Sequence, residues 1–187
     1  MTKFLTIKEK GEQLFQKMKA DPKGKKHCKN PMASLKLVKI VISIGTGSLM
    51  KKDNKKNDAI SGRLAKITGQ KPALKGAKKS IASFKIRQGD PVGLMVTLRG
   101  KRMIAFLEKL INIALPRTKD FRGIDPKVLD DMGNLTLGIK EHTIFPETAD
   151  EDIRDVFGMS ITIVSTAHNK KEGLTFFEAL GVPFKKK

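Results

Sequence analysis

The chain has 187 residues, and its 38 Lys and Arg against 19 Asp and Glu give a formal net charge of +19 at pH 7. At 39% hydrophobic residues it can bury a core, which excludes a disordered tail. The single cysteine, Cys28, excludes an internal disulfide framework, and the sequence lacks an apolar run of the roughly 18 residues that span a bilayer. The first residues resemble neither a secretory signal nor a transit peptide, so we expect a cytoplasmic protein.

The positive charge is concentrated in the first half of the chain. Residues 1–102 hold 26 basic and 6 acidic side chains, a net charge of +20, whereas residues 103–187 hold 12 and 13, a net charge of −1. A local excess of cations attracts phosphates and repels itself when unpaired. The imbalance therefore predicts a polyanionic partner for one part of the molecule.

The first elements are a helix over residues 2–19, predicted from apolar spacing, and a basic loop over residues 20–31. Residues 35–44, rich in Val and Ile, predict a strand with one apolar and one mixed face. The apolar face holds Val38, Ile40, Ile42 and Ile44, and the mixed face holds Leu37, Lys39, Val41 and Ser43.

A cationic loop follows at residues 51–56, and a helix is predicted from about residue 58 to 68, with Gly69 as its stop. Residues 70–99 are interpreted as two strands joined by a long basic loop. The second strand, residues 92–99, also has two faces. Leu94, Val96 and Leu98 form the inner face, and Met95, Thr97 and Arg99 form the outer face.

The second half begins with a helix over residues 101–115, ended by Pro116. A short strand at 134–139, an acidic helix at 150–157, a strand at 160–166 and a helix at 170–180 follow. The predicted inward residues are Met103, Phe106, Leu107, Leu110, Ile111 and Ala114 on the first of these helices, and Leu174, Phe177 and Leu180 on the last.

This order of elements predicts an α+β fold with two layers, in which helices pack on one face of a mainly antiparallel sheet. The other face of the sheet is left open for a partner. We expect residues 1–187 to form a single domain, with a helix and a basic loop in residues 1–34 and the core in residues 35–187.

Three other kinds of site are disfavoured. Gly45-Thr46-Gly47 follows a strand, but Met50 stands where a dinucleotide fingerprint needs its third glycine. His27 and Cys28 lie far from the other histidines, so a metal site is not expected. The cations lie in loops and on strand faces rather than on an amphipathic helix, which disfavours an anionic membrane. We therefore predict no enzyme, no cofactor and no membrane partner.

Nucleic acid is the polyanion that the pattern favours. Residues 71–102 carry nine basic side chains against Asp90 alone. A strand face with Lys39, Ser43, Thr97 and Arg99 offers cations and hydroxyls to phosphates and 2′-hydroxyls, which favours RNA. For the loop at 80–89 two interpretations stay open: its apolar residues form the core of an ordinary hairpin, or the loop lies against a structured RNA.

Six ordered motifs resemble the bacterial form of large ribosomal subunit protein five. The similarity covers nearly everything from about residue 35 to the end of the chain. The motifs are Ile67–Pro72 (ITGQKP), Ser83–Gly89 (SFKIRQG), Val96–Gly100 (VTLRG), Ala114–Arg117 (ALPR), Asp120–Gly123 (DFRG) and Ile144–Glu147 (IFPE).

This resemblance implies an α+β protein of the central protuberance that binds 5S rRNA, helps attach it to the large-subunit rRNA, and reaches peptidyl-site tRNA. Neighbouring ribosomal proteins are further implied partners. The residues expected to bind rRNA are Lys39, Ser43, Gln70, Lys71, Thr97 and Arg99. Those expected to contact tRNA, from the loop at 80–89, are Ser83, Phe84, Lys85, Arg87 and Gln88.

Two residues depart from the family pattern. Ser43 stands where the family commonly has Asn, and a hydroxyl offers fewer hydrogen bonds than a carboxamide. Asp90 stands where the family often has an uncharged residue, and its charge is expected to reduce the local positive potential.

Overall fold

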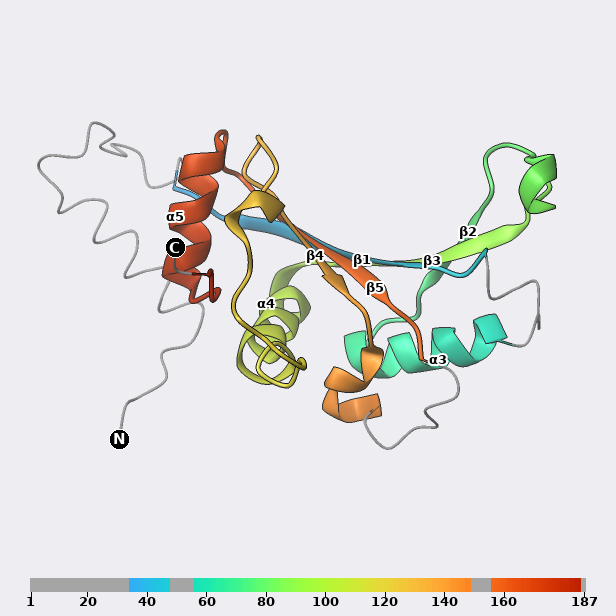
Figure 1. The fold of residues 1–187 in the computed structure, drawn as a ribbon, viewed down its shortest axis with the longest axis horizontal. Coiled ribbons are helices and arrows are strands. Elements are labelled where there is room, and N and C mark those ends of the chain that lie inside the picture. Colours follow the sequence, from blue (N-terminus) through green and yellow to red (C-terminus); the bar gives the residue numbers. More distant parts are fainter. Residues whose placement is uncertain (1–33, 48–55, 149–155, 186–187) are drawn as a thin grey trace, which may run out of the picture. The chain divides into compact units, whose positions relative to one another are not determined.

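The computed structural model describes residues 34–47, 56–148 and 156–185, which form one five-stranded sheet and three α-helices (Figure 1). The strand order is β2-β3-β1-β5-β4, and β3 pairs antiparallel with both β1 and β2. The predicted α+β fold is confirmed. In chain order the elements are β1 (Leu37–Gly45), α3 (Lys56–Thr68), β2 (Ala73–Gly76), β3 (Pro91–Leu98), α4 (Gly100–Lys109), β4 (Leu135–Ile139), β5 (Met159–Ser165) and α5 (Lys170–Leu180).

These bounds confirm the predicted elements that fall in the described ranges, to within a few residues. The predicted helix at 2–19, the loop at 20–31 and most of the cationic loop at 51–56 and the acidic helix at 150–157 lie outside those ranges. Among the described residues, none of the helices has the length and apolar character needed to cross a membrane.

The alternation of β1 and β3 is confirmed with one exception. Ile40, Ile42 and Ile44 of β1 are buried, as are Leu94, Val96 and Leu98 of β3. Val38 is the exception, because it leaves 44% of its surface exposed. It lies at the start of β1, before the stretch in which alternate residues are buried, so the apolar face is shorter than predicted.

The buried faces of two helices differ in detail from the predicted ones. After α4 the chain continues through Leu110–Ala114 as a wider π-type turn, closed by a Leu115 N–H that donates to the Leu110 carbonyl (2.9 Å). The wider turn leaves Ile111 half-buried. On α5, Phe177 and Leu180 are buried as predicted, whereas Phe176 is also buried and Leu174 is only half-buried.

By its contacts the chain divides into two compact units, and both draw on distant parts of the sequence. The first contains residues 1–39, 99–136 and 163–187, and the second contains residues 40–98 and 137–162. The single domain expected for residues 1–187 stays a prediction.

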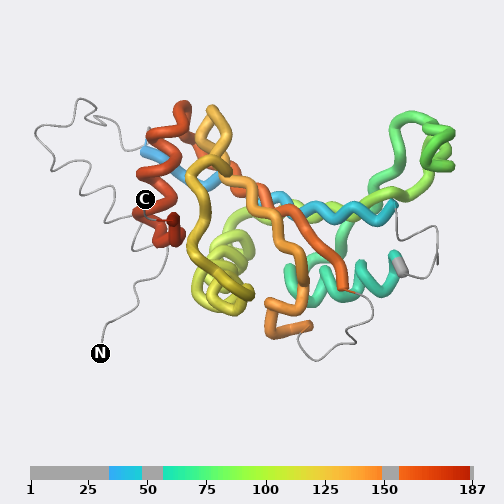
Figure 2. Tube along the Cα trace, viewed as in Figure 1, coloured from blue at the N-terminus to red at the C-terminus, as the bar shows by residue number. Residues whose placement is uncertain are grey.

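In the second unit, α3 covers one side of the strands and a hairpin extends from them. The apolar stripe Ile60, Leu64 and Ile67 of α3 is buried, and α3 contacts β3. The tube in Figure 2 shows the chain between β2 and β3 turning to the opposite side of the strands from α3. One side of these strands therefore carries the core, and the hairpin lies on the other.

In the first unit, α5 packs closely on the loop before β4. A Cβ added to Gly173 would lie 2.7 Å from Gly133 Cα and 2.8 Å from its carbonyl oxygen. Ser165 Oγ donates to the same Gly133 carbonyl (2.9 Å), which joins β5 to the loop. Only glycine fits at 173 without displacing backbone.

Candidate nucleic-acid interface

The second unit has an open strand face on the side away from α3. The register pairs Ala73 with Met95 and Met95 with Ser43, and residues directly opposite one another project to the same side. All members of this open strand face are half-buried or exposed. They are Ala73 and Lys75 of β2, Gly93, Met95 and Thr97 of β3, and Val41, Ser43 and Gly45 of β1.

Two predicted site residues, Ser43 and Thr97, lie on this face. Ser43 is exposed and Thr97 is half-buried, so both hydroxyls are available on a surface of mostly small side chains. A small-residue surface lets a nucleic-acid backbone approach closely, and hydroxyls donate to phosphate oxygens.

The predicted pair Gln70 and Lys71 lies in the link from α3 to β2. Thr68 Oγ1 fixes this link, because it accepts from the Gln70 N–H (3.3 Å), while its one hydrogen is shared between the Leu64 carbonyl (2.7 Å) and the Gln70 carbonyl (3.0 Å). Gln70 is half-buried and Lys71 is exposed. Lys71 lies two residues before β2, whose first residue, Ala73, pairs with Met95 of the open strand face. The link therefore leads directly into β2 at that face.

The remaining two predicted rRNA-binding residues, Lys39 and Arg99, belong to the first unit. Lys39 is half-buried on the mixed side of β1, and Arg99 is exposed immediately before α4. Lys39 precedes Ile40 and Arg99 follows Leu98, the last pair of the β1–β3 register. Both cations therefore lie next to the end of that ladder.

Lys75 is a candidate that the sequence-based set omitted. It is exposed on β2, opposite Gly93, which in turn is opposite Gly45. The two glycines leave a strip of bare backbone beside the lysine. The sequence could not place Lys75 on a face, because β2 is short and the register of β2 shifts between Lys75 and Gly76. Alternation alone therefore could not assign the faces of β2.

The hairpin tip, residues 77–90, is held by backbone hydrogen bonds. Ile81 and Ile86 exchange two bonds, N–H to O, of 2.9 and 3.2 Å. Between them Ala82–Phe84 form a 3₁₀ turn, and the Lys85 N–H donates to the Ala82 carbonyl (3.0 Å). At the base, Gly89 N–H donates to the Ala77 carbonyl (3.0 Å). The tip is therefore an ordered structure rather than a loose loop.

The tip has little core of its own. Ile81 is 46% exposed and Phe84 is 57% exposed, and only Ile86 of the three apolar side chains is half-buried. This exposure excludes an ordinary hairpin core, since the residues of such a core would be covered; contact of the loop with a structured RNA stays a prediction. Ser83, Lys85, Arg87 and Gln88, the other predicted tRNA contacts, are also exposed.

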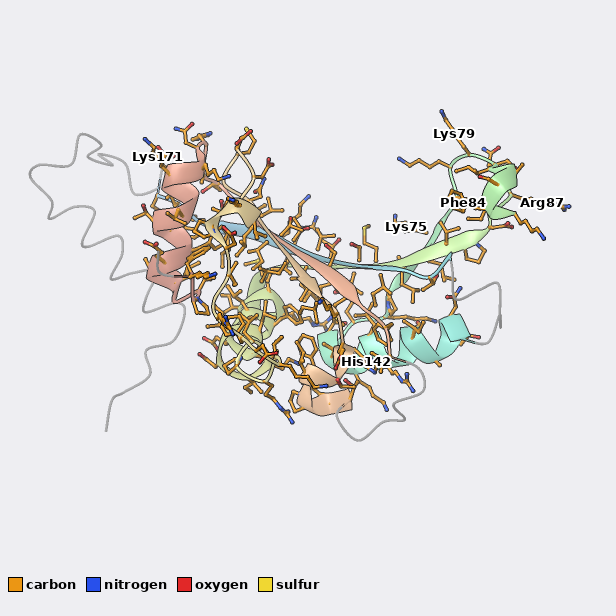
Figure 3. All side chains as sticks on the ribbon, viewed as in Figure 1. Lys75, Lys79, Phe84, Arg87, His142 and Lys171 are labelled. Atoms are coloured by element: carbon orange, nitrogen blue, oxygen red, sulfur yellow. The ribbon has the colours of Figure 1, made fainter. Side chains whose placement is uncertain are left out.

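The tip also concentrates positive charge. Lys78, Lys79, Lys85 and Arg87 are all exposed, and Asp90 is its one acidic residue. Figure 3 shows the side chains of Lys79 and Arg87 extending outward from the tip. An aromatic ring among cations suits a folded RNA, because cations bind phosphates and the ring packs on a base or ribose.

The segment Gly45-Thr46-Gly47 continues the strand pairing. The Thr46 N–H donates to the Val92 carbonyl (2.9 Å), and Thr46 is fully buried. The described residues contain no group of three His, Cys, Asp or Glu side chains that could hold a metal ion.

Comparisons with known proteins assign the family. Residues 91–184 match the ribosomal L5P family C-terminus, and residues 30–87 match Ribosomal protein L5. The chain is 49% identical over 156 residues to large ribosomal subunit protein uL5 of Anaeromyxobacter sp. (strain Fw109-5), covering 83% of this chain and 86% of that protein.

Two further relatives carry the same name. Identity is 51% over 158 residues with the protein of Natranaerobius thermophilus (83% of this chain, 87% of the relative). It is 51% over 150 residues with that of Synechococcus sp. (strain RCC307), covering 80% and 83%. The chain therefore belongs to the ribosomal protein L5 family, and it is a structural, non-catalytic constituent of the large subunit of the cytoplasmic ribosome.

Proposed function

We propose that this protein binds 5S rRNA through the open strand face and helps attach it to the large-subunit rRNA. The observation that carries the proposal is a strand face on the side away from α3 that combines hydroxyls, small residues and the Lys75 cation. Ser43 and Thr97 supply hydroxyls, and Lys71 and Lys75 supply charge. Lys39 and Arg99 add two cations from the first unit.

The hairpin tip has the second role in this proposal, the contact with peptidyl-site tRNA. It carries no core that would explain its order, yet its backbone is fixed and its exposed residues include four cations and the apolar Ile81 and Phe84. Phe84, Lys85 and Arg87 are the main contacts, flanked by Ser83 and Gln88. Neighbouring ribosomal proteins of the central protuberance are partners for the remaining surface.

Two double variants test the separation of the two surfaces. Gln70→Ala with Thr97→Ala should lower the affinity for 5S rRNA about tenfold, the effect of losing two hydrogen bonds. Lys85→Asn with Arg87→Ala should leave that affinity unchanged and weaken tRNA binding by large subunits that contain the variant. Filter binding with 5S rRNA and with tRNA measures both.

Thr175→Ala is a matched control, because it removes an exposed hydroxyl from α5, which belongs to neither surface. It should change neither affinity. An unchanged 5S affinity in the Gln70/Thr97 variant would show that the assigned face is wrong, and equal loss of both ligands in the Lys85/Arg87 variant would refute the separation.

A further inference from the structure

The carboxylate, the N–H and the carbonyl of Asp90 all make hydrogen bonds within the hairpin tip, and together they join its two sides. Its Oδ2 accepts from the Arg87 N–H at 2.7 Å, and its own N–H donates to the Arg87 carbonyl at 3.2 Å. Its carbonyl accepts from the Ala77 N–H at 2.8 Å, on the opposite side of the hairpin. One residue thus connects the strand that enters the tip with the turn that leaves it.

The turn at Arg87–Asp90 depends on these bonds and on Gly89. Gly89 has φ +92°, as the third position of a type II turn requires, and the Asp90 N–H to Arg87 carbonyl bond closes that turn. The Asp90 carboxylate adds a charge-assisted bond to the Arg87 amide, which is stronger than a neutral one. It therefore fixes the backbone from which the Arg87 side chain projects.

Packing does not provide this order. From Lys78 to Asp90, all residues are exposed except the half-buried Ile86. Few buried contacts mean that such a segment opens at low free-energy cost unless hydrogen bonds hold it. A segment that is ordered in advance loses less conformational entropy when it binds.

The charge of Asp90 and its hydrogen bonds are expected to change RNA binding in opposite directions. A carboxylate among four cations lowers the local positive potential, so by charge alone its removal should strengthen phosphate binding. By its hydrogen bond, its removal should weaken RNA binding, because the Arg87 N–H loses its acceptor. Whether RNA affinity rises or falls when the carboxylate is removed therefore shows which contribution is larger.

We propose that Asp90 is a positioning residue that holds the hairpin tip in its RNA-binding conformation. The RNA affinity gained from this ordering exceeds the affinity lost to the negative charge of Asp90. The inference rests on the proposed contact of the tip with tRNA. Asp90 touches no ligand itself; it acts through Arg87.

Asp90→Ala, Asp90→Asn and Asp131→Ala, each in the full-length chain, test this proposal. Asp90→Ala should lower the affinity of variant large subunits for tRNA roughly threefold to tenfold, since a bond to a charged group is lost. Asp90→Asn keeps an acceptor oxygen and should stay within about twofold of wild type. Asp131→Ala removes the same charge from an exposed residue outside the tip and should have no effect.

Hydrogen exchange of the Arg87 amide in the free protein gives a second readout. It should accelerate in Asp90→Ala and remain slow in Asp90→Asn. Unchanged exchange in Asp90→Ala would contradict the positioning role. So would equal or tighter tRNA binding by Asp90→Ala, or an Asp90→Asn variant as weak as Asp90→Ala.

Lys85→Asn separates this proposal from the function on which it rests. If Lys85→Asn weakens tRNA binding and Asp90→Ala does not, the tip contacts tRNA and only the positioning role is refuted. If Lys85→Asn leaves tRNA binding unchanged, the tip makes no such contact and both proposals fail.

Discussion

Lys85 is one of two non-glycine residues with positive φ among those described, the other being Asp120. At φ 53° and ψ 39° its backbone is left-handed, which costs a lysine roughly 1 kcal/mol and suits Gly or Asn better. The side chain is exposed at the end of the 3₁₀ turn, so burial of this side chain does not offset the free-energy cost of the left-handed backbone. A lysine here therefore indicates a role for its charge.

Lys85→Asn separates charge from fold. Asn tolerates the left-handed region, so the free energy of unfolding should change by less than about 0.5 kcal/mol. Loss of one phosphate contact should reduce the salt slope of tRNA binding by about 0.7–0.9. Denaturant unfolding and a salt titration measure the two quantities, and a destabilised variant with normal tRNA binding would contradict the assignment.

His142 is a buried polar residue of the second unit. It is fully buried and stacked on Phe157, with ring centroids 4.1 Å apart and planes 5° apart. The Phe157 N–H donates to His142 Nδ1 (3.3 Å), so the ring accepts at Nδ1. Figure 3 places His142 far from the hairpin tip.

His142→Leu keeps an apolar side chain but leaves the Phe157 N–H without its side-chain acceptor. We expect the free energy of unfolding to fall by about 1–3 kcal/mol, since a buried donor loses its partner. Thr143→Ala, on the same short turn and half-buried, should cost less. RNA binding by the folded variant should be normal; unchanged stability would contradict the role given to this bond.

At the scale of elements, alternation made the strand faces of β1 and β3 predictable, because burial on one side imposes a period of two. The same rule failed at Val38, where β1 begins, and could not assign β2, whose register shifts at Gly76. Most hydrogen bonds of the tip could not be predicted from the sequence, since they join backbone groups; the Asp90 carboxylate bond to the Arg87 N–H depends on the turn geometry. The expectation that Gln70 binds rRNA came from family resemblance, and that for Thr97 from the strand face as well as the resemblance; both stay predictions.

Gly45 offers a direct probe of the open strand face. A Cβ at Gly45 meets no described atom within 4 Å, so Gly45→Val should fold normally while adding a branched side chain to the strip beside Lys75. We expect about tenfold weaker 5S rRNA binding, because a protruding group prevents close contact with the backbone. Gly62→Ala, an equally open position on α3, is the control and should bind normally. Normal binding by Gly45→Val would place the RNA elsewhere.

Gly173 tests the packing of α5 in the first unit. Gly173→Ala forces a methyl group against the Gly133 backbone at 2.7–2.8 Å and should destabilise by about 1–3 kcal/mol. Gly62→Ala makes the same change in an open helical position and should stabilise by roughly 0.5–1 kcal/mol. Thermal unfolding compares them, and a shift of the same sign in both would contradict the close approach.

At the scale of the whole molecule, eight of the 26 basic residues in the strongly positive residues 1–102 belong to the two proposed surfaces. Lys39, Lys71, Lys75 and Arg99 are assigned to the strand face by the proposal, and Lys78, Lys79, Lys85 and Arg87 belong to the tip. The near-neutral residues 103–187 contribute most of α4 together with β4, β5 and α5, which supply much of the buried core. The excess of cations thus lies in the half of the chain that carries both proposed RNA surfaces.

The measurement that tests the central proposal most directly is the salt dependence of 5S rRNA binding by the full-length chain. Four phosphate contacts from the strand face and its flanks should give a slope of about −3 in a plot of log affinity against log salt concentration. Replacement of Lys71 and Lys75 by Ala should reduce that slope by roughly 1.5. An affinity that stays flat with salt, or a slope that the double variant leaves unchanged, would contradict the account.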